Sequence, residues 1–149
     1  MTREDGTFVF GQLFPGDYFL QYQLKEYAFS PSTSTVSVEE GVALEMTVAC
    51  TRTAFSAFGS VTTITGQPIP KQRVLAISAS GHREGGVTDA EGHYRIRGLR
   101  PGQEYTLSVQ GVSNNVPANH VIMMSEEDQF QKDFLLLNTP TSAVCLFFR

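Results

Sequence analysis

Residues 88–107 read TDAEGHYRIRGLRPGQEYTL, and residues 2–20 read TREDGTFVFGQLFPGDYFL. A shift of 86 positions aligns five residues of the stretch 2–20 with identical residues of the stretch 88–107: Thr2, Gly6, Leu13, Pro15 and Gly16 with Thr88, Gly92, Leu99, Pro101 and Gly102. This spacing is too long for the unit of a solenoid and suits small β-sandwiches arranged in tandem. The sequence therefore predicts two copies of one module.

Both copies show the residue alternation of β-strands. Tyr94 and Ile96 alternate with polar residues in the second copy, and Phe8 and Phe10 occupy the matching positions in the first. A period of two residues is that of a strand with one apolar face. No stretch shows a convincing apolar period of 3.6 residues over three helical turns. We therefore expect an all-β protein of tandem Greek-key β-sandwiches.

Glycines mark the predicted turns. Gly6 and Gly92 each follow an acidic residue, and such pairs are typical of tight turns in which glycine takes a positive φ. The pairs Pro15-Gly16 and Pro101-Gly102 fit the central positions of a type II turn, because proline presets the first φ and glycine supplies the second.

A leucine and a tyrosine flank each Pro-Gly pair. Leu99 with Tyr105, and Leu13 with Tyr18, resemble the tyrosine corner of Greek-key sandwiches. In that corner the leucine fills the core, and the tyrosine hydroxyl hydrogen-bonds to the backbone a few residues upstream. We therefore assign these residues a structural role. A Tyr105→Phe change should cost roughly 0.5–1.5 kcal/mol and leave function intact.

The repeat also predicts the domain boundaries. Residues 1–50 match only the back part of a module, so we expect its front strands to be missing and the chain to be a fragment of a longer protein. Residues 54–137 hold a complete sandwich, and residues 138–149 form a divergent tail. The link at residues 50–53 is short, which predicts semi-rigid packing of the two modules.

Charge and hydropathy exclude some partners. The 149 residues carry a net charge of -4, which offers no positive field to hold a phosphate backbone, so we expect no nucleic acid. Residues 1–50 are the acidic part, with seven acidic and two basic residues. No apolar run reaches the length of about 18 residues that a membrane span requires, and the N-terminus does not look like a signal peptide.

Residues capable of catalysis or metal binding are scattered. The histidines share no zinc-site spacing, so we expect all three at the surface: His82, His93 and His120. The stretch Asp89–Gly92 is like the start of a calcium loop but turns into a strand instead of supplying the later ligands. No serine lies in a G-x-S-x-G elbow. We therefore expect no enzyme, no metal and no cofactor.

The two cysteines, Cys50 and Cys145, lie 95 positions apart and match neither a metal spacing nor a C-x-x-C redox pattern. We expect buried free thiols, with a disulfide as the alternative. The chain has no Asn-x-Ser/Thr sequon, so nothing in it marks a glycosylated lumenal face.

Three arginines form a candidate partner-binding face. Arg95, Arg97 and Arg100 lie on or next to the polar side of a predicted strand. An exposed basic strip there suits a protein carboxylate or a lipid headgroup. The alternative is a solvated strand face without a partner.

Further stretches carry a family resemblance. Gly59-Ser60-Val61, Gly66-Gln67-Pro68-Ile69 and Leu99-Arg100-Pro101-Gly102 resemble the carboxypeptidase regulatory-like domain. This resemblance implies a transthyretin-like (prealbumin-like, Ig-like) sandwich of seven strands. Residues 24–32, 38–41 and 52–61 resemble late ectodomain repeats of the Nodal modulator family, whereas residues 138–149 depart from its pattern.

The resemblance implies a non-enzymatic protein of the endoplasmic reticulum membrane with lumenal repeats and no active-site residues. Members of that family assemble with nicalin and a small multipass partner at the translocon. They aid the biogenesis of multipass membrane proteins and have been linked to Nodal signalling. Our leading hypothesis is therefore a lumenal scaffold or spacer that contacts neighbouring repeats and partner proteins.

Two other functions stay open at the sequence level. A carbohydrate-binding module is the main alternative, because related sandwiches bind sugars, although tryptophan is absent and most Phe and Tyr residues fall on predicted core positions. An accessory domain of a secreted peptidase would require an adjoining catalytic domain, which this chain lacks.

Overall fold

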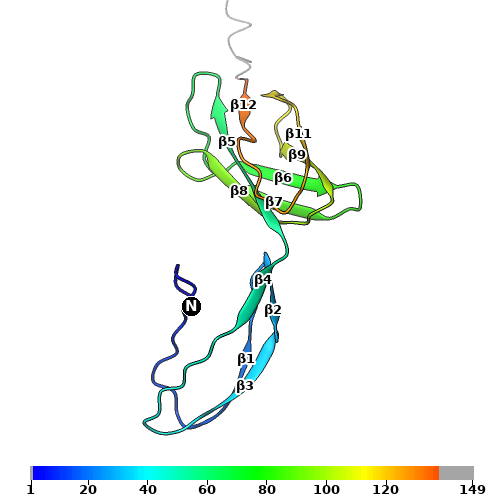
Figure 1. The fold of residues 1–149 in the computed structure, drawn as a ribbon. Coiled ribbons are helices and arrows are strands. Elements are labelled where there is room, and N and C mark those ends of the chain that lie inside the picture. Colours follow the sequence, from blue (N-terminus) through cyan, green and yellow to red (C-terminus); the bar gives the residue numbers. More distant parts are fainter. Residues whose placement is uncertain (1, 138–149) are drawn as a thin grey trace, which may run out of the picture. The chain divides into compact units, whose positions relative to one another are not determined.

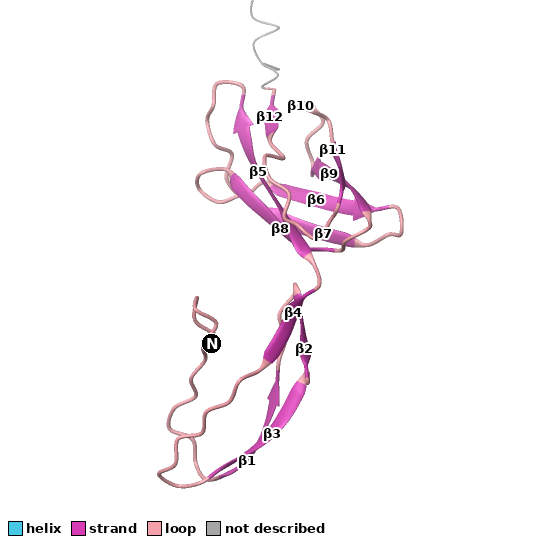
Figure 2. Cartoon of the chain, viewed as in Figure 1, coloured by secondary structure: helices cyan, strands magenta, loops and turns pink. Residues whose placement is uncertain are grey.

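The computed structural model describes residues 2–137 (Figure 1). In this range it contains β-strands and no helix, so none that could cross a membrane (Figure 2). The strands are β1 (Gly16–Gln21), β2 (Tyr27–Ser30), β3 (Thr33–Val38), β4 (Ala49–Arg52), β5 (Phe55–Thr63), β6 (Arg73–Ser78), β7 (Arg83–Val87), β8 (His93–Leu99), β9 (Glu104–Val109), β10 (Asn115–Val116), β11 (His120–Met123) and β12 (Phe134–Leu136). The all-β prediction is confirmed. The predicted tail, residues 138–149, lies outside the described residues.

The chain divides after Thr51 into two compact units. Unit 1 contains β1 to β3 and most of β4, and unit 2 contains β5 to β12. The division falls inside the short link that the repeat predicts, residues 50–53.

Unit 2 is a sandwich of two four-stranded sheets. Sheet I has the order β10-β12-β5-β8, and sheet II has the order β11-β9-β6-β7. Both sheets pair strands that are not consecutive, as Greek-key connections do. The resemblance implied seven strands, whereas unit 2 has eight, because the two-residue β10 pairs with β12 at the end of sheet I.

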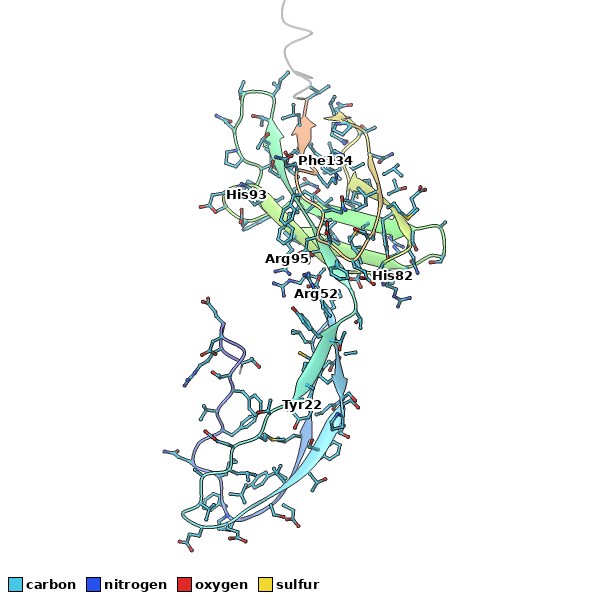
Figure 3. All side chains as sticks on the ribbon, viewed as in Figure 1. Tyr22, Arg52, His82, His93, Arg95 and Phe134 are labelled. Carbon is cyan, nitrogen blue, oxygen red and sulfur yellow. The ribbon has the colours of Figure 1, made fainter. Side chains whose placement is uncertain are left out.

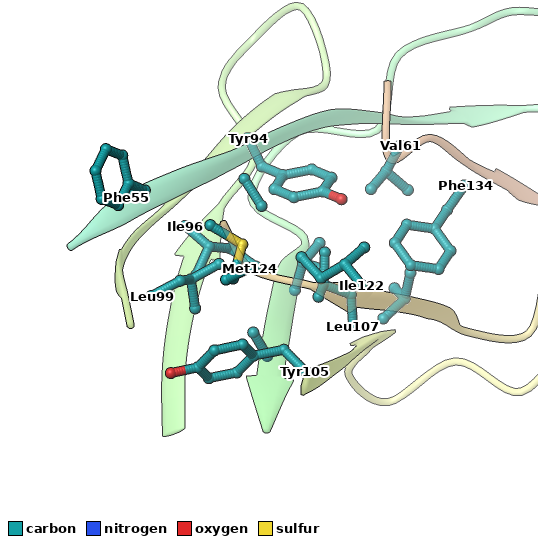
Figure 4. Packing of buried hydrophobic residues seen from close by; sticks show 14 residues of the cluster. Phe55, Val61, Tyr94, Ile96, Leu99, Tyr105, Leu107, Ile122, Met124 and Phe134 are labelled. Atoms are coloured by element: carbon teal, nitrogen blue, oxygen red, sulfur yellow. The ribbon is translucent and has the colours of Figure 1, made fainter. Parts of the chain in front are cut away.

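The core of unit 2 lies between its two sheets (Figure 4). Alternation along each strand turns every second side chain inward, and these side chains form one buried cluster. Sheet I contributes Val61, Ile96 and Phe134, and sheet II contributes Val74 and Leu107, all of them fully buried.

The predicted repeat recurs in the strand pairing. The pairs Tyr18↔Val36 and Leu20↔Ser34 between β1 and β3 correspond to Tyr105↔Ile122 and Leu107↔His120 between β9 and β11. The pair of β2 with β4 likewise corresponds to that of β10 with β12. The cis peptide bonds before Pro31 and Pro117 also lie 86 residues apart. Unit 1 thus has the strand pattern of the back part of unit 2.

The predicted strand through Phe8 and Phe10 is wrong, because the described residues 2–15 contain no strand. Its counterpart in unit 2 is β8, which is hydrogen-bonded to β5. The described part of unit 1 contains no counterpart of β5. Alternation alone therefore could not make this segment a strand, since its backbone has no neighbour to pair with.

Unit 1 buries no apolar side chain within residues 2–51; the one buried residue there is Glu26. Its exposed large apolar residues are Val9, Phe10, Leu13, Phe14, Phe19, Leu24, Val42 and Leu44. The core of the described chain therefore belongs to unit 2.

Candidate functional site

An arginine and two phenylalanines form a ladder on the outer face of sheet I. Phe58 on β5 lies opposite Arg95 on β8, and the guanidinium carbon is 5.0 Å from the Phe58 ring centroid. Phe130 stacks on Phe58 with ring centroids 5.0 Å apart and planes 8° from parallel. We call these three residues the aromatic ladder. Because Phe130 is 61% exposed, the ladder presents an apolar ring to solvent.

A β-bulge brings Phe130 onto Phe58. The Phe58 N–H donates to the Gln129 carbonyl at 2.8 Å, and the Lys132 N–H donates to the Phe58 carbonyl at 3.0 Å. In a regular parallel pair these two partners are two residues apart, so this segment holds one extra residue. The backbone accommodates the extra residue at Gln131, which has a φ of 58°. Bulges of this kind re-aim a side chain, here that of Phe130.

A polar network borders the ladder, and Figure 3 labels its two arginines, Arg52 and Arg95. The Arg52 guanidinium lies 2.6 Å from the Asp128 carboxylate, and the Ser56 N–H donates to the same carboxylate at 2.8 Å. Arg95 Nε donates to Ser56 Oγ at 2.9 Å. Burial by itself would raise the pKa of Asp128, but the Ser56 N–H and the Arg52 guanidinium outweigh it and lower that pKa below its usual value.

An Asp128→Asn substitution tests this network. Because the pKa of Asp128 is lower in the folded state, its charge stabilises the fold above the unfolded pKa of about 3.9, and this contribution is lost as the pH falls through the folded value. We expect the variant to lose about 1–2 kcal/mol of unfolding free energy at pH 7. The difference from the original chain should shrink in urea titrations below about pH 4. Glu127→Gln, an exposed neighbour, is the control and should show no such loss.

The predicted basic strip does not form as expected. Arg95 is half-buried and engaged by Phe58 and Ser56. Arg97 is exposed on the same face of β8, and Arg100 follows the strand at an exposed position. The prediction of an exposed Arg95 is wrong, because an aromatic ring and a serine from the neighbouring strand cover it. Arg97 therefore remains as the exposed cation of this face of β8.

The Tyr105 hydroxyl is the centre of a buried hydrogen-bond network. Leu99 and Tyr105 are fully buried, and the Arg100 N–H donates to the Tyr105 hydroxyl at 3.1 Å. The hydroxyl also lies 2.7 Å from His82 Nδ1, and His82 Nε2 is 3.4 Å from a Glu84 carboxylate oxygen. The corner residue thus joins the end of β8 to the loop between β6 and β7.

A Tyr105→Phe substitution should therefore cost more than one hydrogen bond. It removes the partner of both the Arg100 N–H and the His82 ring, so we expect a loss of about 1–3 kcal/mol in unfolding free energy. Urea unfolding measures the loss. Tyr18→Phe is the matched control: the Tyr18 hydroxyl donates to the Phe14 carbonyl in an exposed bond, and its loss should cost less. Equal losses would argue against the network.

The turn glycines of unit 2 take left-handed conformations. Gly92 has a φ of 76°, and an added Cβ would lie 2.7 Å from the Val61 carbonyl oxygen. Gly102 also has a φ of 76°, as the third residue of a type II turn requires, and it follows the half-buried Pro101. A side chain at either position would therefore be strained.

The matching residues of unit 1 behave differently. Gly6 has a φ of 83°, and Tyr18 donates its hydroxyl to the Phe14 carbonyl at 2.7 Å. Leu13, however, is 42% exposed and fills no core. Gly16 opens β1 with a φ of 155°, so the type II turn predicted at Pro15-Gly16 is wrong. Within residues 2–51 no apolar side chain is buried, so Leu13 has no core to enter.

Two of the three histidines are not at the surface as predicted. His82 is half-buried against Tyr105, and His120 is half-buried with its ring centroid 4.8 Å from that of Phe134, the two rings meeting edge to face. Both pack against aromatic residues that the fold brings from other strands. His93 is exposed as expected.

Asp89, Glu91 and His93 bring ligand atoms within 4.8 Å of one another on the turn before β8. All three are exposed. Asp89 already accepts the backbone N–H groups of the other two at 2.9 Å each, which explains the cluster as a turn. We assign no metal to it.

Cys50 is a free thiol at an exposed position of β4, so the prediction of a buried thiol is wrong there. It belongs to unit 1, where no core exists to bury it. Cys145 lies outside the described residues.

Sequence reasoning missed the main parts of this site. Phe58 alternates with the buried Ala57, and this alternation could have placed it on the outer face. No local signal marks Phe130 or Asp128, because their positions depend on the bulge beside β5 and on hydrogen bonds to residues more than 70 positions away.

Several curated proteins are similar to this chain, and some of them are named as subunits of one complex. "BOS complex subunit NOMO1" of Mus musculus is 33% identical over 86% of the chain, and "BOS complex subunit NOMO3" of Homo sapiens has the same identity and coverage. "Nicotinic receptor-associated protein 4" of Caenorhabditis elegans is 34% identical over 83% of the chain. The chain spans only 11% to 12% of the length of these relatives.

Among solved structures, the Bacillus anthracis TIE protein matches 91% of this chain and 27% of its own, with a TM-score of 0.44 and 17% identity. The carboxypeptidase regulatory-like domain family matches residues 57–134, which is nearly the whole described range of unit 2 and more than half of the chain. The eight-stranded sandwich of unit 2, its buried tyrosine corner and this match agree, and the chain belongs to the carboxypeptidase regulatory-like domain family.

Proposed function

We propose that this chain is a non-catalytic module of an endoplasmic reticulum membrane complex, where it works on the lumenal side as a scaffold or spacer that contacts other proteins. The observation that carries the proposal is the 33% identity to BOS complex subunits, which extends over 86% of the chain. The family match covers unit 2 alone, whereas this likeness also includes unit 1. It therefore points to one kind of tandem protein rather than to the module in general.

The proposed partners are a nicalin-like membrane protein and a small multipass protein, together with neighbouring sandwich modules. In such a complex the chain would serve the biogenesis of multipass membrane proteins at the translocon and modulate Nodal signalling. The aromatic ladder supports a role in protein contact, because aromatic and arginine side chains dominate the binding energy of protein interfaces.

We also propose that unit 1 is the back part of a second module. Its β1 and β4 each pair with one neighbour, whereas the corresponding β9 and β12 each pair with two. Phe10 and Leu13 are exposed in unit 1, whereas their counterparts Ile96 and Leu99 are fully buried in unit 2. Front strands equivalent to β5 to β7 would cover these residues and pair with the open edges of β1 and β4.

Cell fractionation tests the proposed location. We expect the endogenous protein in the microsomal fraction, resistant to added protease until detergent opens the vesicles. Recovery in the cytosolic fraction, or digestion without detergent, would refute the lumenal assignment. A lumenal chaperone and a cytosolic enzyme in the same fractions control for vesicle integrity.

A further inference from the structure

The edge of β1 that faces away from β3 pairs with no strand among residues 2–51. In unit 2 the equivalent edge of β9 pairs with β6, which runs antiparallel to it over residues 74–78. The two strands have the same neighbour on their other side, because β3 pairs with β1 as β11 pairs with β9. The repeat therefore shows, within one chain, what kind of strand fits the open edge of β1.

The inward side of β1 requires small side chains on a neighbouring strand. Leu20 of β1 corresponds to Leu107 of β9, and the residue of β6 opposite Leu107 is Ala76. The other inward residues of β6 are Val74 and Ser78, and all three are buried. Long or charged side chains at these alternate positions would meet the half-buried Leu20 and the side chains next to it.

The outward side of β1 offers an apolar contact that β9 lacks. Phe19 is 69% exposed, and its counterpart on β9 is Thr106, which lies opposite Ile77 of β6. A residue in the position of Ile77 would pack against the Phe19 ring, because aromatic and β-branched side chains stabilise each other across antiparallel strands. The sequence of β6 therefore fits β1 on both sides.

We propose that the open edge of β1 binds an extended strand of β6-like sequence from a separate molecule, antiparallel to β1 and with a small side chain opposite Leu20. Main-chain hydrogen bonds supply the affinity and the alternate small side chains supply the specificity, as where a peptide extends a sheet. This inference rests on the proposal that unit 1 is the back part of a second module. It extends that proposal to a strand supplied by another molecule.

A capped peptide of residues 71–80, which contains β6, tests the proposal with the full-length chain. We expect saturable binding in fluorescence anisotropy and slower amide hydrogen exchange over residues 16–22. A peptide with Ala76→Lys should bind about tenfold more weakly or worse, because it places a long cation opposite Leu20. A peptide with Leu75→Lys is the matched control and should bind as well as the original, because its side chain lies on the outward side.

Variants of the chain test the position of the site. Phe19→Ser should weaken peptide binding by about threefold or more, whereas Phe14→Ser, 81% exposed and outside β1, should not. Circular dichroism of each variant checks that the strands remain folded. Absence of binding would overturn the proposal. So would slower exchange in unit 2 instead of β1, or equal binding of the Ala76→Lys and Leu75→Lys peptides.

A graft separates this inference from the module proposal on which it rests. Residues 55–86, placed directly before Met1, supply copies of β5, β6 and most of β7 at the spacing of the repeat. If unit 1 is the back part of a module, the graft should slow exchange over residues 16–22. A graft with this effect and a peptide that does not bind would overturn only the binding of a separate strand. A graft without this effect would contradict the module proposal itself.

Discussion

Replacing Phe134 by alanine is expected to lower the free energy of unfolding of unit 2 by about 3–5 kcal/mol. Phe134 is fully buried, and its ring lies 4.8 Å from the centroid of His120 and 6.5 Å from that of Tyr94. It also lies on β12 opposite Val61 of β5. It therefore links the last strand of unit 2 to the first. The alanine would leave a cavity between the sheets that these neighbours fill only partly.

Urea unfolding followed by circular dichroism measures this loss as a lower midpoint at an unchanged slope. Phe130→Ala is the matched control, four positions away and 61% exposed, and it should cost about 1 kcal/mol or less. Equal losses for the two variants would show that Phe134 is not part of the core.

Gly59→Ala should destabilise unit 2 by about 3 kcal/mol or more, although it adds a single methyl group. An added Cβ would lie 2.6 Å from the Lys132 carbonyl carbon and 2.7 Å from the Tyr94 hydroxyl oxygen. The Tyr94 hydroxyl donates to that same Lys132 carbonyl. The methyl group would therefore displace the bulged segment that positions Phe130, and backbone cannot move aside as cheaply as a flexible side chain.

The control for this prediction is Gly66→Ala. Gly66 has a φ of 86°, but nothing lies within 4 Å of an added Cβ, so the change should cost only the backbone strain of about 1 kcal/mol. Thermal unfolding of both variants compares the steric cost of the methyl group at Gly59 with the conformational cost of the methyl group at Gly66. If Gly59→Ala were no less stable than Gly66→Ala, the close approach of Lys132 to β5 would be incorrect.

The repeat made much of the fold predictable from sequence. The matching Gly92 and Gly6, and the matching pairs of β1 with β3 and β9 with β11, follow from local turn chemistry and from alternation. These signals are local, so they are present in unit 1 even though its described residues contain no counterpart of β5. They identified the tyrosine corner at Tyr105 but not its bonds to His82, which comes from a distant loop.

The predictions that proved wrong have one cause in common: they depend on residues that are distant in the sequence. Phe8 and Phe10 alternate as a strand would, but a strand requires a hydrogen-bonded neighbour, and the described part of unit 1 contains none for them. Arg95 lies on the polar side of β8 as predicted, yet Phe58 and Ser56 cover it from β5. Period and composition indicate which side a residue faces, whereas burial depends on what the fold brings against that side.

The aromatic ladder depends on the same kind of information. Phe58 and Phe130 are 72 positions apart, and their stacking depends on one extra residue in the segment beside β5. A bulge of this kind has no reliable signal in a single sequence, so the candidate site could be identified only from the structure.

We propose that this chain contacts other proteins of a membrane complex and performs no catalysis. The most direct test is a pull-down of the tagged full-length chain from detergent-solubilised endoplasmic reticulum membranes, with bound proteins identified by mass spectrometry. The affinity resin without the tagged chain controls for non-specific capture. We expect recovery of a nicalin-like protein with the tagged chain and not with the resin alone. Recovery of no membrane protein by the folded chain, or recovery of glycoproteins that free sugar displaces, would contradict it.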